Sequence, residues 1–224
     1  MKNLLFLILT LFSCEYQNDL IHIKPELMTM KIAISGVASV GCVVFDGDSN
    51  TARLWMSSYF TNGWDVATGG AGTIEVLDRI PMVASVQPSI VVLMVGTNDL
   101  GSIYNPGSNQ HSGYIDETLQ DFFDRYQQIV DSYKLSSAKK IICVSVLPQT
   151  QGFLVPDASI NDFINLANKK LKILVESSGC IFIDEWSDFY DAENNRIKEE
   201  YDADGLHINT NGGNLHMENI IAVF

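Results

Sequence analysis

The chain has 224 residues, of which 46% are hydrophobic and 18% are charged, and its formal net charge is −13. This composition is typical of a globular protein rather than a disordered one, and the length suits one domain with a sizeable core. The excess of negative charge disfavours nucleic acid and anionic membrane surfaces as partners.

The first thirteen residues have the pattern of a secretory signal. One positive charge precedes the apolar run Leu4–Phe12, which is too short to span a bilayer as a helix. The run leads into Leu11-Phe12-Ser13-Cys14, which resembles the lipobox of bacterial lipoproteins, with Cys14 as the residue that would be acylated. We therefore expect an exported protein that is either membrane-anchored by a lipid, in the periplasm or at the cell surface, or else secreted.

The rest of the chain divides into a tether and one folded domain. Residues 14–29 mix polar and apolar side chains without a sustained period, as expected of a tether, and the domain follows at 30–224. Its first stretch, Met30–Val40, predicts a short β-hairpin or an extra edge strand.

Strands and helices are expected to alternate through this domain. The predicted strands are Cys42–Phe45, Trp64–Ala67, Ser89–Val95, Ile141–Leu147 and Ile181–Ile183. The predicted helices are Ala52–Phe60, a stretch through Ile74, Leu77, Ile80 and Val83 that Pro81 would kink or break, Asp116–Tyr133, Ile160–Ser177 and Asn211–Val223. Loops are expected at Leu100–Gly113, Gln149–Ala158 and Asp184–Ala203. This alternation predicts a three-layer α/β/α sandwich with a five-stranded parallel sheet.

Polar residues follow three of the predicted strands. Ser49 comes after the first strand, Gly70 after the second and Asn98 after the third. Ligands of such sheets bind beyond the carboxyl ends of the strands, so these residues are candidates for one site. Ser49 would also stand at the amino end of a helix, where free N–H groups favour a negative oxygen.

Four separated pieces together resemble the SGNH (GDSL-type) hydrolase family. They are Gly47-Asp48-Ser49-Asn50, the glycine loop Gly69–Gly72, Gly96-Thr97-Asn98-Asp99 and Asp204-Gly205-Leu206-His207, with Asn209 and Gly212 continuing the last. The resemblance runs from about Cys42 to the C-terminus and implies a flavodoxin-like fold and a serine esterase. The glycine loop is the loosest match, because Asp65 or Ala67 stands where the family usually has Asn.

The chemistry of these residues agrees with that resemblance. Ester hydrolysis through an acyl-enzyme needs a hydroxyl, a base, a group that orients the base, and donors for the oxyanion. Ser49 supplies the hydroxyl and His207 the base, while Asp204, three residues before His207, can reach the other imidazole nitrogen. The expected oxyanion donors are the backbone N–H of Ser49, that of Gly70 in preference to Gly69, and the side-chain amide of Asn98.

The remaining histidines and cysteines give no second site. His111 and His216 lack an Asp three residues before them, His22 has Asp19 there but lies in the predicted tether, and Asp202 lies outside the Asp-x-x-His spacing. Cys42, Cys143 and Cys180 lie in apolar runs and are expected to be buried free thiols. No cysteine and histidine cluster has metal-site spacing, and the predicted reaction needs no cofactor.

Two other functions are compatible with parts of the sequence. Phe45-Asp46-Gly47-Asp48 also resembles the Asp-x-Asp start of haloacid-dehalogenase-type phosphatases, in which the first carboxylate is the nucleophile and Mg²⁺ is bound. That family needs a downstream Lys and an acidic pair, and only Asp184-Glu185 offers the pair. The second alternative is a non-catalytic surface-binding lipoprotein, which the intact Ser, Asp and His disfavour.

The substrate is less determined than the reaction. The family resemblance implies acetylated carbohydrates, lysophospholipids, thioesters or simple esters. Tyr104, His111 and Tyr114 in one predicted loop, with Phe153 in another, would give a polar, aromatic lining that suits an O-acetylated sugar.

Overall fold

The computed structural model describes residues 42–54, 59–60, 62–105, 117–150 and 159–224. The predicted signal, the tether and the strand or hairpin at Met30–Val40 lie outside the described residues, so they stay predictions. Among the helices of the described ranges, none is both long enough and apolar enough to cross a membrane.

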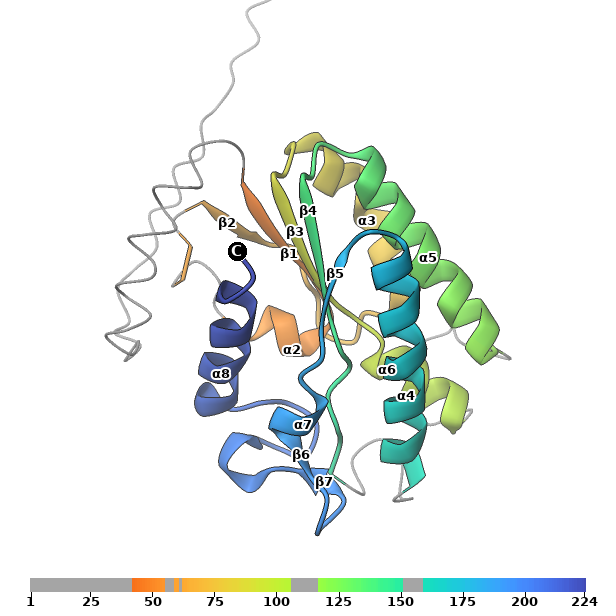
Figure 1. Ribbon diagram of the computed structural model, residues 1–224, viewed down its shortest axis with the longest axis vertical. Coiled ribbons are helices and arrows are strands. Elements are labelled where there is room, and N and C mark those ends of the chain that lie inside the picture. The colour runs from red at the N-terminus through yellow and green to blue at the C-terminus, as the bar shows by residue number, and fades with distance from the viewer. Residues whose placement is uncertain (1–41, 55–58, 61, 106–116, 151–158) are drawn as a thin grey trace, which may run out of the picture.

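A five-stranded parallel sheet forms the centre of the domain (Figure 1). Its order is β2-β1-β3-β4-β5, and the strands are β1 (Val43–Gly47), β2 (Gly63–Asp65), β3 (Ile90–Met94), β4 (Lys140–Val144) and β5 (Ile181–Ile183). In the register of β1, Phe45 lies opposite Asp65 of β2 and Val92 of β3. The predicted five-stranded parallel sheet is thus confirmed, with β2 beginning and ending earlier than predicted.

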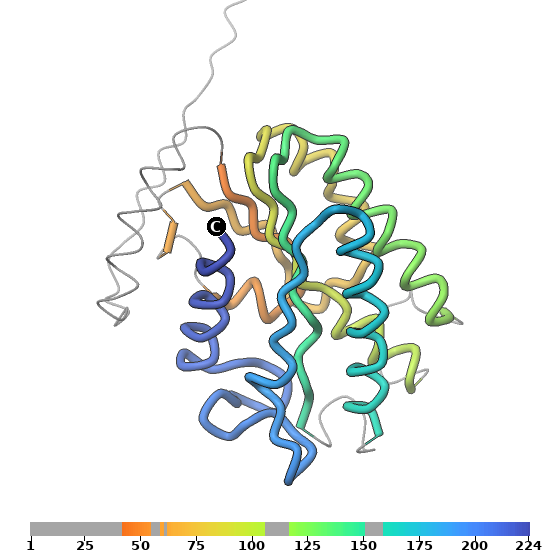
Figure 2. Tube along the Cα trace, viewed as in Figure 1, coloured from red at the N-terminus to blue at the C-terminus, as the bar shows by residue number. Residues whose placement is uncertain are grey.

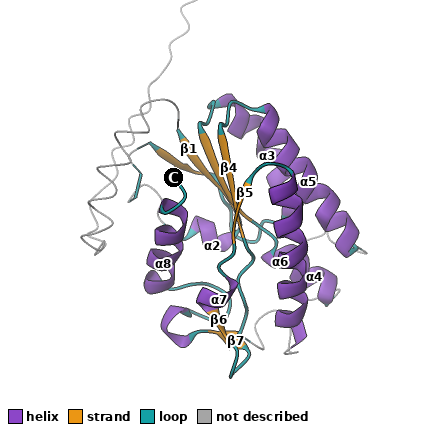
Figure 3. Ribbon diagram, viewed as in Figure 1, coloured by secondary structure: helices purple, strands orange, loops and turns teal. Residues whose placement is uncertain are grey.

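Helices cover both faces of the sheet, as Figures 1 and 3 show. One face packs against α3 (Thr73–Ser85), α5 (Leu119–Leu135) and α6 (Ser159–Ser177), and the other against α2 (Ser49–Ala52) and α8 (Thr210–Ile221). Successive strand residues alternate between the two faces: Val44 and Leu93 point to the first core, Phe45 and Val92 to the second. This is the predicted three-layer sandwich.

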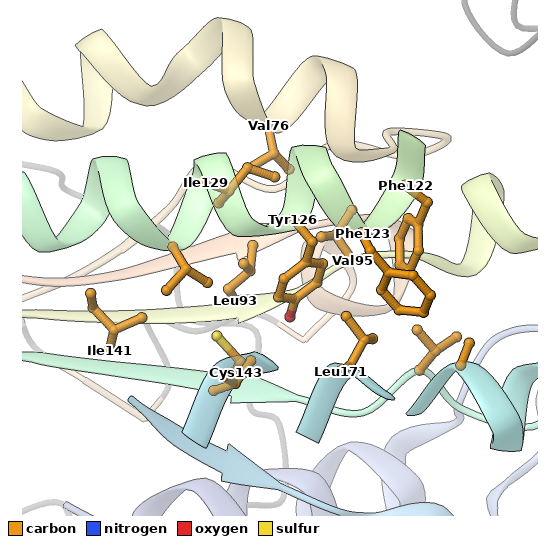
Figure 4. Close-up of a cluster of buried hydrophobic side chains, with 14 of the residues drawn as sticks. Val76, Leu93, Val95, Phe122, Phe123, Tyr126, Ile129, Ile141, Cys143 and Leu171 are labelled. Atoms are coloured by element: carbon orange, nitrogen blue, oxygen red, sulfur yellow. The ribbon is translucent and has the colours of Figure 1, made fainter. Parts of the chain in front are cut away.

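The larger core lies between α5 and the sheet (Figure 4). The apolar stripe of α5 supplies Phe122, Tyr126 and Ile129, each of which is fully buried. In Figure 4 the ring of Tyr126 lies between its helix and the side chains of Cys143 and Leu171. Burying one large side chain of this kind stabilises the fold by about 1.5–3 kcal/mol. Because the apolar residues of α5 lie on one face of a helix, helix formation buries all of them together.

Two short helices differ from the prediction. The first helix, expected at Ala52–Phe60, is α2 at Ser49–Ala52, because the side chain of Asp48 caps it three residues earlier. The segment expected to be a loop from Leu100 begins with α4 (Thr97–Tyr104), since burial of Leu100 in the core overrides the weak helix preference of its glycine and serine neighbours. Residues 55–58 and 106–113 lie outside the described residues.

Pro81 neither breaks α3 nor ends it. The helix continues from Thr73 to Ser85 with Pro81 inside it, so the predicted break is wrong. The ring of Pro81 removes one backbone N–H donor from the helix, and the side chain lies on its exposed face.

The segment Asp184–Ala203, expected to be irregular, contains four short elements. They are α7 (Trp186–Phe189), the antiparallel pair β6 (Tyr190–Asp191) and β7 (Arg196–Ile197), and the 3₁₀ turn η2 (Glu199–Tyr201). Phe189 and Ile197 are fully buried in the core under α8, and this burial, rather than any local period, orders the segment.

The end of β1 requires glycine. Gly47 has φ +151°, and a Cβ there would lie 1.9 Å from the carbonyl oxygen of Met94 in the adjacent strand.

We expect Gly47→Ala to lower the free energy of unfolding by roughly 3 kcal/mol, because it combines backbone strain with a steric clash. Urea denaturation followed by circular dichroism would measure this. Gly69→Ala is the control: its Cβ meets nothing within 4 Å, so unchanged stability is expected there. Equal effects of the two substitutions would contradict the argument.

Candidate active site

The nucleophile candidate Ser49 stands at the turn between β1 and α2. The backbone N–H of Asp48 donates to the carbonyl of Met94 at 3.1 Å, and the Asp48 carboxylate accepts from the N–H of Asn50 at 3.0 Å. Ser49 is therefore the first residue of α2, and it stands at the amino end of a helix, as the sequence predicted. Because α2 has four residues, it offers the free N–H of Ser49 rather than a sustained helix dipole.

The predicted base and its partner meet this serine. The Nε2 atom of His207 lies 2.9 Å from Ser49 Oγ, and its Nδ1 atom lies 2.7 Å from Asp204 Oδ2 and 2.9 Å from Oδ1. Ser49 and His207 are 158 residues apart in the sequence. The structure thus brings the three predicted residues into one continuous line of hydrogen bonds, with the tautomer of His207 set by its carboxylate partner.

Asp204 is held as a carboxylate. Partial burial raises its pKa, but hydrogen bonds from the His207 side chain and from the backbone N–H groups of His207 and Leu206 outweigh this and lower the pKa to about 2. Arg53 Nη1 adds a weak, exposed contact at 3.4 Å from Oδ2. A carboxylate that stays ionised at any ordinary pH can stabilise an imidazolium beside it.

The C-terminal segment that carries His207 lies beside the start of the domain. Figure 2 shows the blue C-terminal helix alongside the orange segment that follows β1. Asn209 caps this helix, accepting from the N–H groups of Asn211 and Gly212 at 2.9 and 3.1 Å. The loop before the cap, which holds Asp204 and His207, is thereby brought against α2.

The three predicted oxyanion donors lie in the segments that follow three neighbouring strands, β1, β2 and β3. Asn98 belongs to the first turn of α4, is 7% exposed, and donates one of its two amide hydrogens to the carbonyl of Ala71 at 2.9 Å. In the described part of the chain, the backbone N–H groups of Ser49 and Gly70 donate to no acceptor. Three donors are thus left for a ligand oxygen, one from each of the loops after β1, β2 and β3.

Gly70 has a conformational reason to be glycine. The N–H of Ala71 donates to the carbonyl of Thr68 at 3.1 Å, which closes a turn with Gly69 and Gly70 at its two central positions. Gly70 has φ +76°, whereas Gly69 has no positive φ, so the turn is of type II and requires glycine at position 70. Of the two glycines, Gly70 is therefore the one whose conformation this turn requires.

A side chain that the sequence analysis did not assign joins the first two loops. Arg79 of α3 donates to the Asp46 carboxylate at 2.5 Å, to the carbonyl of Gly47 at 2.6 Å and to Thr68 Oγ1 at 3.4 Å. The N–H of Thr68 also donates to Gly47, at 3.2 Å. The serine turn and the glycine loop are therefore fixed to each other by one partly buried guanidinium.

Asp99 joins the second and third loops in the same way. Its buried carboxylate accepts from the N–H of Thr73 at 3.0 Å and from Thr73 Oγ1 at 2.5 Å, at the start of α3. Arg125 of α5 donates to Thr73 Oγ1 at 2.8 Å and pairs with Glu117. The residue after Asn98 thus fixes the loop of Asn98 to the loop of Gly70. Its place in Gly-Thr-Asn-Asp was the only sign of this in the sequence.

The other titratable residues lie apart from this cluster. His216 is buried with Glu185, its Nδ1 atom 2.6 Å from Oε2, and it does not contact Ser49. The three cysteines of the described residues are free; Cys143 is buried, as predicted, and burial raises its pKa to about 12, while Cys42 and Cys180 are only partly buried. No group of three potential metal ligands occurs among the described residues.

Of the four residues expected to line the substrate site, Tyr104 lies within the described residues. Tyr104 lies at the end of α4, where its hydroxyl pairs with that of Ser159 and its ring lies 5.4 Å from the ring of Phe163. It packs against α6, and this contact does not mark it as a substrate residue. His111, Tyr114 and Phe153 lie outside the described residues.

Comparison with known proteins agrees with this geometry. The model of the GDSL-like Lipase/Acylhydrolase family matches residues 41–215. A rice (Oryza sativa subsp. japonica) protein, GDSL esterase/lipase WDL1, is 23% identical over 199 residues, covering 82% of this chain and 69% of the relative.

Solved structures share the fold at low sequence identity. A GDSL-like lipase from Bacteroides thetaiotaomicron is 19% identical with a TM-score of 0.67, covering 88% of this chain and 96% of its own. Axe2, an acetylxylan esterase from Geobacillus stearothermophilus, is 15% identical with a TM-score of 0.65, covering 82% of this chain and 94% of its own. At these identities the likeness concerns the fold alone.

The carboxylate of Asp48 leads to a prediction on pH. Burial raises its pKa to about 6, against the lowering effect of its hydrogen bond from Asn50. The folded protein therefore binds a proton that the unfolded chain, with an ordinary pKa near ~3.9, has released, so this group adds stability as the pH falls from about 6 to about 4. Asn has the same shape, caps a helix equally well and does not titrate.

We expect Asp48→Asn to remove about 2 kcal/mol from the change in unfolding free energy between pH 7 and pH 4. Urea denaturation at several pH values would measure the difference from the wild type. Asp78→Asn, which changes an exposed carboxylate of α3, is the control and should leave the pH dependence intact. Parallel curves for the wild type and Asp48→Asn would contradict the prediction.

Proposed function

The chain belongs to the GDSL-like lipase/acylhydrolase family and is an ester-bond hydrolase, and we propose that it works through an acyl-enzyme formed on Ser49. One observation carries this proposal: the unbroken line of hydrogen bonds from Ser49 Oγ through the imidazole of His207 to Asp204. A hydroxyl, a base and an orienting carboxylate in this order are what nucleophilic ester cleavage needs.

The proposed reaction has two halves. Ser49 Oγ attacks the acyl carbon while His207 Nε2 takes the hydroxyl proton, and the tetrahedral intermediate collapses when His207 returns that proton to the leaving alcohol. A water molecule then attacks the acyl-enzyme, with His207 again taking and returning a proton, which releases the carboxylic acid and restores Ser49. Asp204 holds the imidazole in the required tautomer and stabilises the imidazolium in both halves.

The oxyanion of both intermediates would be held by the donors of three loops. The N–H groups of Ser49 and Gly70 and the second amide hydrogen of Asn98 are left for it. The amide of Asn98 is already oriented by Ala71, so it needs no reorganisation when the charge develops. One such donor is typically worth roughly 3–4 kcal/mol of transition-state stabilisation.

The position of Asp46 argues against the phosphatase alternative. Its side chain is fully buried and is bound by Arg79 and by the hydroxyl of Tyr133 on the helix side of β1. A carboxylate enclosed in this way cannot reach a phosphate monoester without unfolding the end of β1. Asp48, the second aspartate of that motif, is equally buried and caps α2.

We propose an O-acetylated carbohydrate as the substrate class. The support comes from the polar and aromatic residues that the sequence offers at His111, Tyr114 and Phe153, and from the name of the acetylxylan esterase whose fold this chain shares. Lysophospholipids and thioesters are the alternative substrates within the same family. Lysophospholipids differ from acetylated sugars in the length of the acyl chain, and thioesters differ in the leaving group.

The function is tested on the purified protein with p-nitrophenyl esters of increasing acyl length beside acetylated xylan. We expect acetyl esters to be cleaved best, with a rate that EDTA does not change, and release of acetate from the xylan. Ser49→Ala should abolish turnover on every ester, since it removes the attacking oxygen, and a fluorophosphonate should label Ser49 in the wild type. Full activity in Ser49→Ala would overturn the serine mechanism, and preference for long acyl chains would overturn the substrate class.

Asp204→Asn and Asp202→Asn distinguish the orienting carboxylate from its neighbour. Asp204 contacts the imidazole, whereas Asp202 accepts from the N–H of Gly205 at 2.5 Å and from Thr150 Oγ1 at 2.8 Å. We expect Asp204→Asn to lower kcat at least about 100-fold, because the amide favours the wrong tautomer and does not stabilise imidazolium. Asp202→Asn keeps an acceptor for the loop and should lower kcat far less. The reverse order in steady-state kinetics would show that the assignment is wrong.

A further inference from the structure

Two sets of hydrogen bonds near His207 do different things. The first is internal to residues 203–207: Asp204 Oδ1 accepts from the N–H groups of Leu206 and His207, at 3.2 and 2.9 Å, and the carbonyl of His207 accepts from the N–H of Ala203 at 2.9 Å. These bonds fix the imidazole relative to Asp204. They do not fix either residue relative to Ser49, which belongs to another part of the fold.

The second set comes from Asn50, the residue next to Ser49. Asn50 Nδ2 donates to the carbonyl of Leu206 at 3.3 Å, and Asn50 Oδ1 accepts from the N–H of Ile208 at 3.1 Å. The amide therefore pairs with the main chain on both sides of His207. Asn50 is 1% exposed, so water cannot replace these bonds when they are lost.

We propose that Asn50 is a positioning residue that fixes the His207 loop to the nucleophile's own helix. Through its two bonds, α2 and the loop share one rigid geometry, in which Ser49 Oγ and His207 Nε2 lie 2.9 Å apart. The remaining contact between α2 and Asp204, made by Arg53, is long and exposed to solvent. Misplacement of a base by about 1 Å costs on the order of 100-fold in rate, so such a clamp acts on turnover.

The amide at position 50 differs from the residue that the family name gives there. That name denotes Gly-Asp-Ser-Leu, and here Asn50 stands in the position of leucine. A leucine has nearly the same volume but can neither donate to Leu206 nor accept from Ile208. A leucine at this position would leave the Leu206 carbonyl and the Ile208 N–H without these partners.

Asn50→Leu and Asn50→Ala test the proposal, which rests on the proposed function of Ser49 and His207. We expect both variants to fold and to lower kcat at least about 10-fold on a p-nitrophenyl acetate substrate, with KM within twofold of the wild type. The rate of Ser49 labelling by a fluorophosphonate should fall by the same factor, because that reaction needs the same base. Leucine fills the space without a cavity, and in a variant that circular dichroism shows to be folded a loss of activity comes from the loss of the two hydrogen bonds.

Asn214→Ala is the matched control. Asn214 is also a buried amide that joins the same parts of the chain, accepting from the Tyr59 hydroxyl at 2.8 Å, but it does not contact the His207 loop. We expect it to lower the melting temperature about as much as Asn50→Ala while kcat stays within twofold of the wild type. Wild-type kcat in a folded Asn50→Leu, or an equal loss of kcat in Asn214→Ala, would overturn the proposal.

Different results would overturn the serine mechanism and the role of Asn50. If Ser49→Ala keeps its activity, the serine mechanism itself is wrong. If Ser49→Ala is inactive and Asn50→Leu is as active as the wild type, only the role of Asn50 is wrong.

Discussion

The parallel pairing of β1 with β2 on one side and β3 on the other is the constraint on which this site depends. Because all three strands run in the same direction, the loops that follow them open at one edge of the sheet. The chain moves from β1 outward to β2 and then returns to the opposite side for β3, which makes this edge a switch point of the topology. Ser49, Gly70 and Asn98 gather there because each follows one of these strands.

Buried polar groups turn this proximity into a fixed geometry. Asp46 with Arg79 fixes the serine turn to the glycine loop, and Asp99 with Thr73 fixes the glycine loop to the helix of Asn98. Burial raises the pKa of both carboxyls, so the fold holds these groups at a cost that their hydrogen bonds must offset. Such a network contributes to the position of the donors more than to net stability.

The prediction from the sequence differs from the structure mainly at the short elements. The long stripes of α5 and α6 were predicted within a few residues, because a period sustained over several turns reports burial of one face. α4 was missed, since glycine, serine and asparagine have weak helix propensity and its order comes from Leu100 in the core. The segment around Phe189 and Ile197 was missed for the same reason: its partners lie in distant elements.

The sequence by itself determined the fold class and the chemical identity of the candidate site. Alternating strand and helix patterns predict a parallel sheet, and Ser49, Asn98, Asp204 and His207 follow motifs whose residue types specify a reaction. Local spacing also sufficed to choose Asp204 over Asp202, since three residues allow a side chain to reach back to its imidazole. Only the tertiary structure decided which groups hold these residues together. Asn50, Arg79 and Asp99 act through main-chain groups of segments far along the chain, and such partners leave no period or spacing in a sequence.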